Sequence, residues 1–358
     1  MRDTMIRNCQ CWFPRPGEWV KGKLVGSGSF GTVHLAMNKS TGGLFVVKQS
    51  HSGAGLEALE NEFKILKSLK SSPYIVQCLG TEKGKGNISV LMEYMAGGSV
   101  ADVAQKFGGS LEEEVVRLYT REILKGLKDL HQHGIVHCDL KCKNVLLGSS
   151  GDIKLADFGC AKELKDLKGS GGLVKSLKSI GGTPLWMAPE VLRKESLDCA
   201  ADIWSLGCTV IEMATGRPPW GGDVSNPMAA ILRIAQGNET PQFPTHFSNE
   251  GLDFLSKCLE RDSAKRWTAE ELLNHPFVSG NSRRNSQKKH ACSPASVLEV
   301  QGFNAGYDSD EPESLEENDF STRNPLTWCR VEGKATAMWP WEDSEFGSSG
   351  NWVTVRSG

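Results

Sequence analysis

The chain has 358 residues, of which 39% are hydrophobic and 23% charged, and its formal net charge is -2. This balance is ordinary for a globular protein and indicates neither a nucleic-acid partner nor insertion into a membrane. No apolar run reaches the roughly 18 to 20 residues that a membrane helix needs, and the first residues lack the pattern of a secretory signal. The 11 cysteines form no CxxC pairs, which favours reduced thiols in the cytoplasm or nucleus over a zinc ribbon or a disulfide framework.

Composition divides the chain into three predicted segments. Residues 1–18 are a short leader, residues 19–278 carry the apolar periodicity of a folded domain, and residues 279–358 are polar. The last segment contains a basic run, an acidic run and tryptophans without helical or strand period. Because this composition buries too little apolar surface to fold alone, we expect a disordered tail that regulators could bind.

The first part of the folded segment is predicted to be rich in strands. Residues 20–25 and 32–36 flank a glycine-rich loop, and residues 44–47 and 88–93 are further short apolar runs typical of strands. Between the last two runs lies an amphipathic helix. Its apolar positions recur at helical spacing, at Leu56, Leu59, Phe63 and Leu66.

The second part is predicted to be mostly helical. Ser110 followed by Glu113 matches a capping box, and the helix after it has an apolar face that runs through residues 115–130. Residues 203–213 are apolar enough for a buried helix, and Thr268 opens a second capping box before a last helix. The sequence therefore predicts an α+β fold in which strands come first and helices follow.

The glycine-rich loop has the pattern GxGxxG, which by itself fits several structures. It occurs in dinucleotide-binding turns, in loops over the phosphates of ATP, and in structural turns without a ligand. A dinucleotide turn requires a helix to open at the third glycine, whereas an alternating, strand-like pattern follows here. We therefore expect a strand-loop-strand clamp over a triphosphate. The residues expected to contact ATP are Val25, Gly26, Ser27, Gly28, Ser29, Phe30, Gly31, Thr32 and Val33.

Lys48 ends an apolar strand that follows this loop. A lysine at a strand end is commonly a solvated edge residue, but here it could hold the α- and β-phosphates of ATP. That function needs a carboxylate to keep the ammonium group in place. Glu62, expected on the polar side of the helix that buries Phe63, is the candidate partner.

A short stretch in the helical part supplies three groups that phosphoryl transfer needs. Asp139, Lys141 and Asn144 lie within six residues and offer a carboxylate, a cation and an oxygen ligand for Mg²⁺. Asp157, in the sequence Asp-Phe-Gly, is a second oxygen ligand for the metal. Each of these residues alone is more often a turn or cap residue, but their joint presence points to phosphoryl-transfer chemistry.

The ordered set of motifs resembles that of eukaryotic protein kinases. The chain has the glycine loop, the strand lysine, the HxD sequence at 137–139, the DFG sequence at 157–159 and the APE sequence at 188–190. The resemblance covers about residues 19–277, and the motifs together are specific. It implies a bilobed kinase fold, with a strand-rich N-lobe, a helical C-lobe and ATP bound between them.

The resemblance also implies the functions of individual residues. Asp139, Lys141 and Lys48 would be the catalytic residues, whereas Asn144 and Asp157 would hold Mg²⁺, for which Mn²⁺ could substitute. Residues 91–95 would be the hinge that receives adenine through its backbone at Glu93 and Met95, with Met92 as the gatekeeper. Ser99 and Asp102 would lie near the ribose. The structural residues would be Asp202, which would steady the catalytic loop, and Arg266, which would pair with Glu190.

The class of kinase is indicated by two further features. Lys141 and Thr183 are typical of serine/threonine kinases, in which the threonine would hydrogen-bond the catalytic Asp139 and Lys141. The segment 181–191 is similar to mitogen-activated protein kinase kinase kinases, and the Cys138 variant of the HxD motif together with the tail resembles the plant stress-responsive members. The substrates would then be proteins, namely downstream kinase-kinases.

Two alternatives and one departure from the family accompany this interpretation. A catalytically dead scaffold should have lost Lys48, Asp139 or Asp157, and a metabolic ATP enzyme would not need the peptide-docking segment 181–190. Cys138 stands where most of these kinases have an arginine that receives the phosphate of the activation loop, and a thiol cannot do so. We therefore expect that phosphorylation of the loop serines is not the main switch. Those serines are Ser170, Ser176 and Ser179.

Overall fold

The computed structural model describes residues 17–28, 30–50, 53–69, 72–84, 87–167, 181–221 and 227–280. All of these residues belong to one compact unit. The predicted leader and tail, apart from two residues of each, lie outside this part of the chain, and so do Ser29 and the three loop serines. Predictions about those segments are therefore not addressed by the structure.

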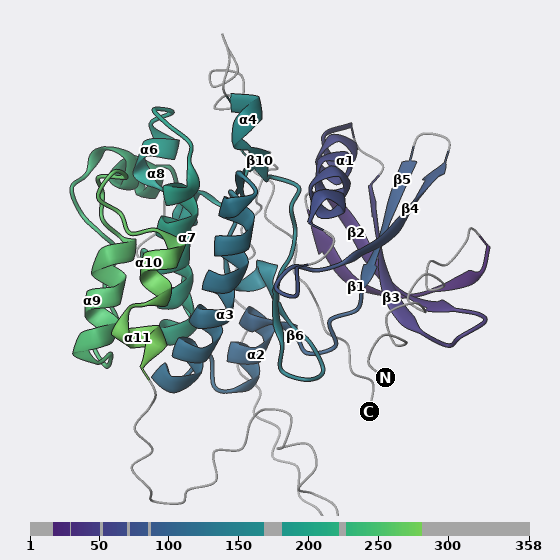
Figure 1. The fold of residues 1–358 in the computed structure, drawn as a ribbon, viewed down its shortest axis with the longest axis horizontal. Helices are drawn as coiled ribbons and strands as arrows, with labels where there is room; N and C mark the ends of the chain where they lie inside the picture. Colours follow the sequence, from purple (N-terminus) through teal and green to yellow (C-terminus); the bar gives the residue numbers. More distant parts are fainter. Residues whose placement is uncertain are drawn as a thin grey trace, which may run out of the picture. The chain divides into compact units, whose positions relative to one another are not determined.

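Five antiparallel strands form the sheet of the N-lobe, in the order β1-β2-β3-β5-β4 (Figure 1). Their bounds are Trp19–Gly28 (β1), Gly31–Asn38 (β2), Leu44–Ser50 (β3), Cys78–Gly84 (β4) and Asn87–Glu93 (β5). Successive residues of a strand point to opposite faces, and neighbours such as Val46 and Val47 accordingly belong to different apolar clusters. One face joins the main core together with α1 (Gly53–Ser68), and Trp19 packs on the cluster of the other face.

The predicted strands of the N-lobe are confirmed, but β4 was missed. Its sequence, CLGTEKG, has no regular alternation of large apolar and polar side chains, and its residues are half-buried or exposed. Pairing with β5 along its whole length holds this strand in the sheet. The pairing of β4 with its neighbour depends on tertiary structure, so the local sequence contains little evidence for this strand.

The C-lobe is mainly helical, as predicted, and α3 packs against α7, α10 and α11 (Figure 1). The longer helices are α2 (Val100–Lys106), α3 (Glu113–Gln132), α7 (Cys199–Thr215), α8 (Pro227–Gln236) and α9 (Asn249–Cys258). The short ones are α4 (Leu164–Leu167), α6 (Pro189–Leu192), α10 (Ala269–Leu273), α11 (Pro276–Ser279), η2 (Cys142–Asn144) and η3 (Pro184–Trp186). The short strands are β6 (Gly98–Ser99), β7 (Ile135–Val136), β8 (Val145–Leu147), β9 (Ile153–Leu155) and β10 (Lys162–Glu163). Among the described residues, no helix is both long and apolar enough to cross a bilayer.

The predicted buried helix is α7, whose residues are almost all inaccessible to solvent. A helix that is apolar on every side has to lie inside the protein. It ends at Gly216, which adopts a left-handed conformation with φ of 65°. A Cβ atom at this position would lie 1.9 Å from the carbonyl oxygen of Gly109, so only glycine fits there.

The capping box predicted at the start of α3 is wrong. The helix begins at Glu113 itself, so Ser110 lies too far upstream to cap it, and the N-cap residue Glu112 makes no side-chain capping bond. The Glu113 carboxylate instead accepts hydrogen bonds from Arg117 at 2.5 Å and from the Ser248 hydroxyl at 2.6 Å. The second predicted capping box, at Thr268, is present.

The buried face of α1 is rotated from the predicted one by about one residue. The buried positions include Ala58, Leu59 and Glu62, whereas Phe63 is only partly buried. The prediction that Glu62 lies on the polar side of the helix is therefore wrong. The spacing of apolar residues gave the helix correctly, but it could not anticipate that a charged residue would be buried because it pairs with another charge.

Candidate active site

The glycine loop joins β1 and β2 as a hairpin, in which Gly28 pairs with Gly31. No helix opens at the third glycine, so the strand-loop-strand arrangement is confirmed. Gly31 has φ of 138°, and a Cβ atom there would lie 2.0 Å from the carbonyl oxygen of Gln49 on β3. Glycine is thus required at this position by its backbone conformation and by the neighbouring strand.

A cavity lies beside β1, next to the start of this loop, and extends along the hinge. Apolar side chains line two of its sides, with Val25 and Val46 contributed by the N-lobe sheet and Leu146 and Ala156 by the C-lobe. Among the described loop residues that were predicted to contact ATP, only Val25 lines the cavity. Two apolar walls suit a flat aromatic base, so the cavity fits the adenine ring of ATP.

The hinge forms the edge of the cavity through Met92, Glu93, Tyr94 and Met95. The Glu93 carboxylate does not point at a nucleotide: it accepts from Lys154 at 2.7 and 2.8 Å and from the backbone N–H of Gln77 at 2.7 Å. A direct side-chain contact of Glu93 with adenine is therefore disfavoured. The predicted contact through the backbone of this segment remains compatible with the geometry.

Ser99 and Asp102, predicted near the ribose, also line the cavity. They are paired with each other in the capping box that begins α2, where the Ser99 hydroxyl lies 2.7 Å from the Asp102 carboxylate. Because that box satisfies the first backbone donors of the helix, it fixes both side chains at the cavity wall.

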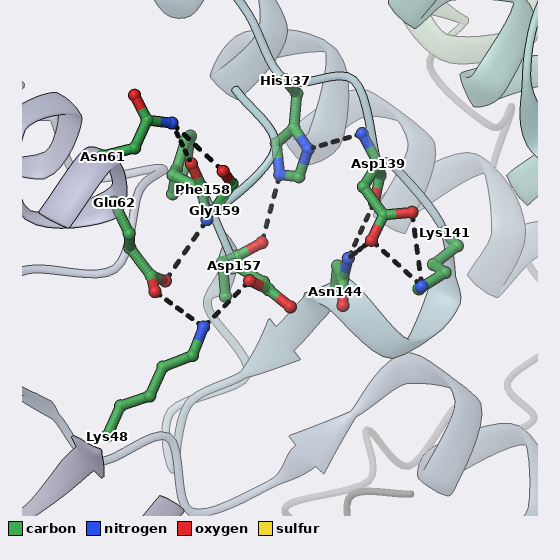
Figure 2. A network of polar contacts seen from close by, with 11 residues as sticks. Lys48, Asn61, Glu62, His137, Asp139, Lys141, Asn144, Asp157, Phe158 and Gly159 are labelled. Atoms are coloured by element: carbon green, nitrogen blue, oxygen red, sulfur yellow. Dashed lines mark hydrogen bonds and ion pairs between the residues drawn. The ribbon is translucent and has the colours of Figure 1, made fainter. Parts of the chain in front are cut away.

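Three charged side chains meet at the inner end of the cavity (Figure 2). The ammonium group of Lys48 lies 2.6 Å from the Glu62 carboxylate and 2.9 Å from that of Asp157. Lys48 comes from β3, Glu62 from α1, and Asp157 follows β9, so residues of both lobes contribute. The structure thus brings together three residues that the sequence singled out separately.

Burial and charge pull the pKa values of this cluster in different directions. Burial alone would lower the pKa of Lys48, but the carboxylates of Asp157 and Glu62 outweigh it and raise that pKa. Burial raises the pKa of Glu62, whereas the Lys48 ammonium group overcomes burial at Asp157 and lowers the pKa of that carboxyl. Asp157 therefore stays ionised at neutral pH, as a metal ligand must.

The second cluster is centred on Asp139, which is 5% exposed. Its carboxylate accepts hydrogen bonds from the Thr183 hydroxyl at 2.7 Å, from Lys141 at 3.0 Å and from the Asn144 amide at 3.0 Å. The Thr183 hydroxyl also accepts from Lys141 at 2.5 Å. The contact predicted between Thr183 and the pair of Asp139 and Lys141 is therefore present.

The catalytic loop rests on Asp202, a completely buried carboxylate on α7. It accepts from the backbone N–H groups of His137 at 2.8 Å and Cys138 at 3.0 Å, and it lies 2.9 Å from His131. The contacts of Asp202 with His131 and His137 outweigh burial and lower the pKa of this carboxyl group. The predicted ion pair of Arg266 and Glu190 is also formed, at 2.7 Å.

Two residues of the site have left-handed backbones although they are not glycine. Cys138 has φ of 66° and Asp157 has φ of 65°, and such a conformation costs roughly 1–2 kcal/mol per residue. The backbone N–H of Cys138 donates to Asp202. Its side chain carries no positive charge, unlike the arginine that most of these kinases have at this position. Burial raises the pKa of its thiol well above the usual range, so this side chain stays neutral.

The two predicted metal ligands each offer an oxygen atom of the kind that a hard cation prefers. Asn144 uses its amide nitrogen on Asp139, which leaves the amide oxygen as the atom suited to a metal. Within the described residues, no group of three or more His, Cys, Asp or Glu side chains could hold a metal on its own. Asn144 and Asp157 therefore fit a hard cation whose remaining ligands are phosphate oxygens and water.

Sequence reasoning missed three residues of this region. Lys154 supports the hinge through Glu93, Lys23 lines the cavity, and Asn61 contacts the segment after Asp157 (Figure 2). None of the three belongs to a motif, and Asn61 and Lys154 reach partners that lie far away in the sequence. The one available signal in the sequence was that Asn61 directly precedes Glu62, the predicted partner of Lys48.

Comparison with known proteins agrees with this geometry. A family model described as the protein kinase domain matches residues 19–278. Mitogen-activated protein kinase kinase kinase 2 of Arabidopsis thaliana is 42% identical over 295 residues, which cover 78% of this chain and 44% of that protein. Mitogen-activated protein kinase kinase kinase 17 of the same plant is 43% identical over 269 residues, which cover 73% of this chain and 70% of that protein. Mitogen-activated protein kinase kinase kinase 20, also from this plant, is 42% identical over 273 residues, which cover 73% of this chain and 78% of that protein.

The chain thus spans less than half of the first relative and more than two thirds of the other two. The kinase model covers more than half of the chain and includes both clusters around Lys48 and Asp139. The resemblance inferred from the motifs is confirmed, and this family in general uses ATP and a divalent metal. This chain belongs to the protein kinase family, and its relatives of similar length are named mitogen-activated protein kinase kinase kinases.

Proposed function

We propose that this chain is a serine/threonine protein kinase that transfers the γ-phosphoryl group of ATP to a protein hydroxyl. The observation that carries the proposal is the hydrogen-bonded group of Asp139, Lys141 and Thr183 beside the cluster of Lys48, Glu62 and Asp157. A carboxylate, a cation and a metal-binding carboxylate are the groups that phosphoryl transfer requires. A scaffold without activity would not need all of them in hydrogen-bonding contact.

Each cluster has a separate task in the proposed reaction. Lys48, held by Glu62, binds the α- and β-phosphates, and Asn144 and Asp157 would hold Mg²⁺. A bound Mg²⁺ offsets the negative charge of the phosphates. Asp139 accepts the proton of the attacking hydroxyl. The new bond forms between that oxygen and the γ-phosphorus, and the bond to the bridging oxygen of ADP breaks.

Lys141 and Thr183 order the acceptor side of the site. Lys141 neutralises charge on the transferred phosphoryl group, because its ammonium group already lies beside the Asp139 carboxylate. Thr183 bridges Lys141 and Asp139 and thereby fixes the orientation of the carboxylate. This pairing supports a preference for serine or threonine hydroxyls, as the resemblance implies.

We further infer that the substrates are kinase-kinases in a mitogen-activated cascade. This inference rests on the printed names of the relatives, and the relatives of similar length come from a plant. A function in stress signalling, residence in the cytoplasm or nucleus, and binding of regulators by residues 279–358 remain predictions from the sequence.

The test is a transfer assay with the full chain, ATP, Mg²⁺ and a panel of inactive kinase-kinases. Each substrate is paired with a variant that lacks its activation-loop serine and threonine residues, and the D139N protein serves as the enzyme control. We expect labelled phosphoserine or phosphothreonine on the intact substrate alone. Labelling only on tyrosine, or no difference between the chain and D139N, would refute the proposal. Repeating the assay on a chain ending at Gly280 tests whether the tail controls activity.

A further inference from the structure

The Asn61 side chain, on α1, makes contacts that no part of the proposed reaction uses. Its amide nitrogen donates to the carbonyl oxygens of Phe158 and Gly159, each at 3.2 Å (Figure 2). It also donates to the carbonyl oxygen of Ala161 at 2.9 Å. These partners follow Asp157 directly and lie about a hundred positions away in the sequence. One side chain of α1 therefore binds the backbone of the segment that begins with the predicted metal ligand.

The chemistry of the partners fixes the orientation of this amide. All three are carbonyl oxygens, so an amide oxygen turned toward them would be repelled, and only the nitrogen fits. The nitrogen has two hydrogens for three acceptors, so at least one hydrogen is shared between two oxygens. Asn61 thus acts as a donor, and an aspartate of the same shape would place a negative charge against three acceptors.

Phe158 is held from both sides by adjacent residues of α1. Its backbone N–H lies 3.3 Å from the Glu62 carboxylate, and its carbonyl oxygen accepts from Asn61. The same carboxylate of Glu62 pairs with Lys48. A displacement of α1 away from this segment would therefore break the Asn61 contacts together with the pair that positions Lys48.

A second contact lies one helical turn later but is weaker. Lys64 lies 2.9 Å from Glu163 and 3.4 Å from Asp166. The Lys64 side chain is 58% exposed, and ion pairs at such exposure contribute little because water screens them. The partly buried amide of Asn61 is consequently a stronger link between α1 and this segment than the exposed Lys64.

We propose that Asn61 is a positioning residue that holds α1 where Glu62 can pair with Lys48. Its effect on turnover rests on the proposed function, but its effect on nucleotide binding does not. The competing possibility is that Asn61 only caps backbone carbonyls and adds to the stability of the domain. The two differ in whether the loss of Asn61 acts through the Lys48 and Glu62 pair.

The experiment compares N61A, N61D, E62Q and the double variant N61A/E62Q in the full chain. E60A is the matched control, because Glu60 is an exposed neighbour on the same helix. Each protein is titrated with Mg²⁺ and a non-hydrolysable ATP analogue by calorimetry, and its unfolding temperature is measured. Turnover on a substrate found with the wild-type chain is measured in parallel.

We expect N61A to weaken analogue binding about tenfold, the effect of losing about one to two hydrogen bonds. N61D should lose at least as much, because its shape is retained but its donor is not. E60A should bind within about twofold of wild type. The double variant should bind no more than about twofold more weakly than E62Q, because residues that act through one contact are not additive.

Three results would overturn the proposal. The first is that N61D binds the ATP analogue as tightly as the wild type does. The second is that the losses of affinity in N61A and E62Q multiply in the double variant. The third is that N61A unfolds at a much lower temperature while its affinity for the analogue is unchanged. A failure of the proposed function has a different signature. If the wild-type chain phosphorylates nothing while the N61A effect on binding remains, the positioning proposal stands and the kinase proposal fails.

Discussion

Replacing Thr183 by valine removes the hydroxyl that joins the two central groups of the catalytic loop and retains the shape of the side chain. In the structure this hydroxyl donates to Asp139 at 2.7 Å and accepts from Lys141 at 2.5 Å. The T183S variant keeps the hydroxyl and loses only a methyl group. The pair of variants therefore separates the hydrogen bonds from the packing.

The expected magnitude follows from the burial of the two partners. Asp139 is 5% exposed and Lys141 is 3% exposed, so water cannot fully replace the lost bonds. A hydrogen bond to a charged group contributes about 1.5–3 kcal/mol. Applied to the barrier, this lowers the turnover number about 10-fold to 150-fold. Lys141 and Asp139 still contact each other at 3.0 Å, so the loss should remain below that of removing the base.

The assay measures kcat and the KM for ATP on one protein substrate for the wild type, T183V, T183S and D139N. We expect T183V to lower kcat and leave the KM for ATP within about twofold, because the Lys48 cluster at the cavity is untouched. T183S should retain most of the turnover. Circular dichroism and unfolding temperature check that each variant is folded.

Three outcomes would contradict this reasoning. If T183V turned over within about twofold of wild type, the hydroxyl would have no part in ordering Asp139 and Lys141. If T183S were as slow as T183V, the methyl group rather than the hydrogen bonds would be responsible. A rise in the KM for ATP with unchanged kcat would place the effect at the nucleotide instead.

Three further predictions concern the same site. D139N should lower turnover by about 10² to 10⁴ with little change in ATP affinity, measured by transfer assay and calorimetry, and near-normal turnover would remove Asp139 from the reaction. Asp202→Ala should destabilise the fold by about 2–6 kcal/mol in urea, because two buried backbone N–H groups lose their acceptor, and a loss under about 1 kcal/mol would contradict this. Because the pKa of Asp202 is lowered in the fold, its carboxylate stabilises the fold above the unfolded pKa of about 4, and this stabilisation is lost as the pH falls below that value. The free energy of unfolding of the alanine variant should therefore decrease less than that of the wild type when the pH is lowered. Changing Ser170, Ser176 and Ser179 together to alanine should keep most of the activity, and a folded protein with a hundredfold loss would show that loop phosphorylation is the switch.

The sequence by itself predicted a strand-rich part followed by a helical part, and its motifs pointed to phosphoryl-transfer chemistry. Motif residues are local in the chain, so the spacing of Asp139, Lys141 and Asn144 could be read directly. The helical period predicted α3, and an apolar run predicted α7. A glycine loop followed by a strand pattern gave the hairpin of β1 and β2. Each of these signals depends on residues within about one element, which is the range over which periodicity and turn chemistry act.

Only the tertiary structure decided which side chains meet. Asn61 and the carbonyl oxygen of Phe158 are 97 positions apart, and Glu113 and Ser248 are 135 apart, so no local period relates them. The burial of Glu62 and the presence of β4 could not be predicted for the same reason. Glu62 is buried with Lys48, and β4 pairs with β5, so each depends on a partner that the fold brings close. A charged residue can be buried when its partner is buried with it, and the sequence does not contain that partner's position in space.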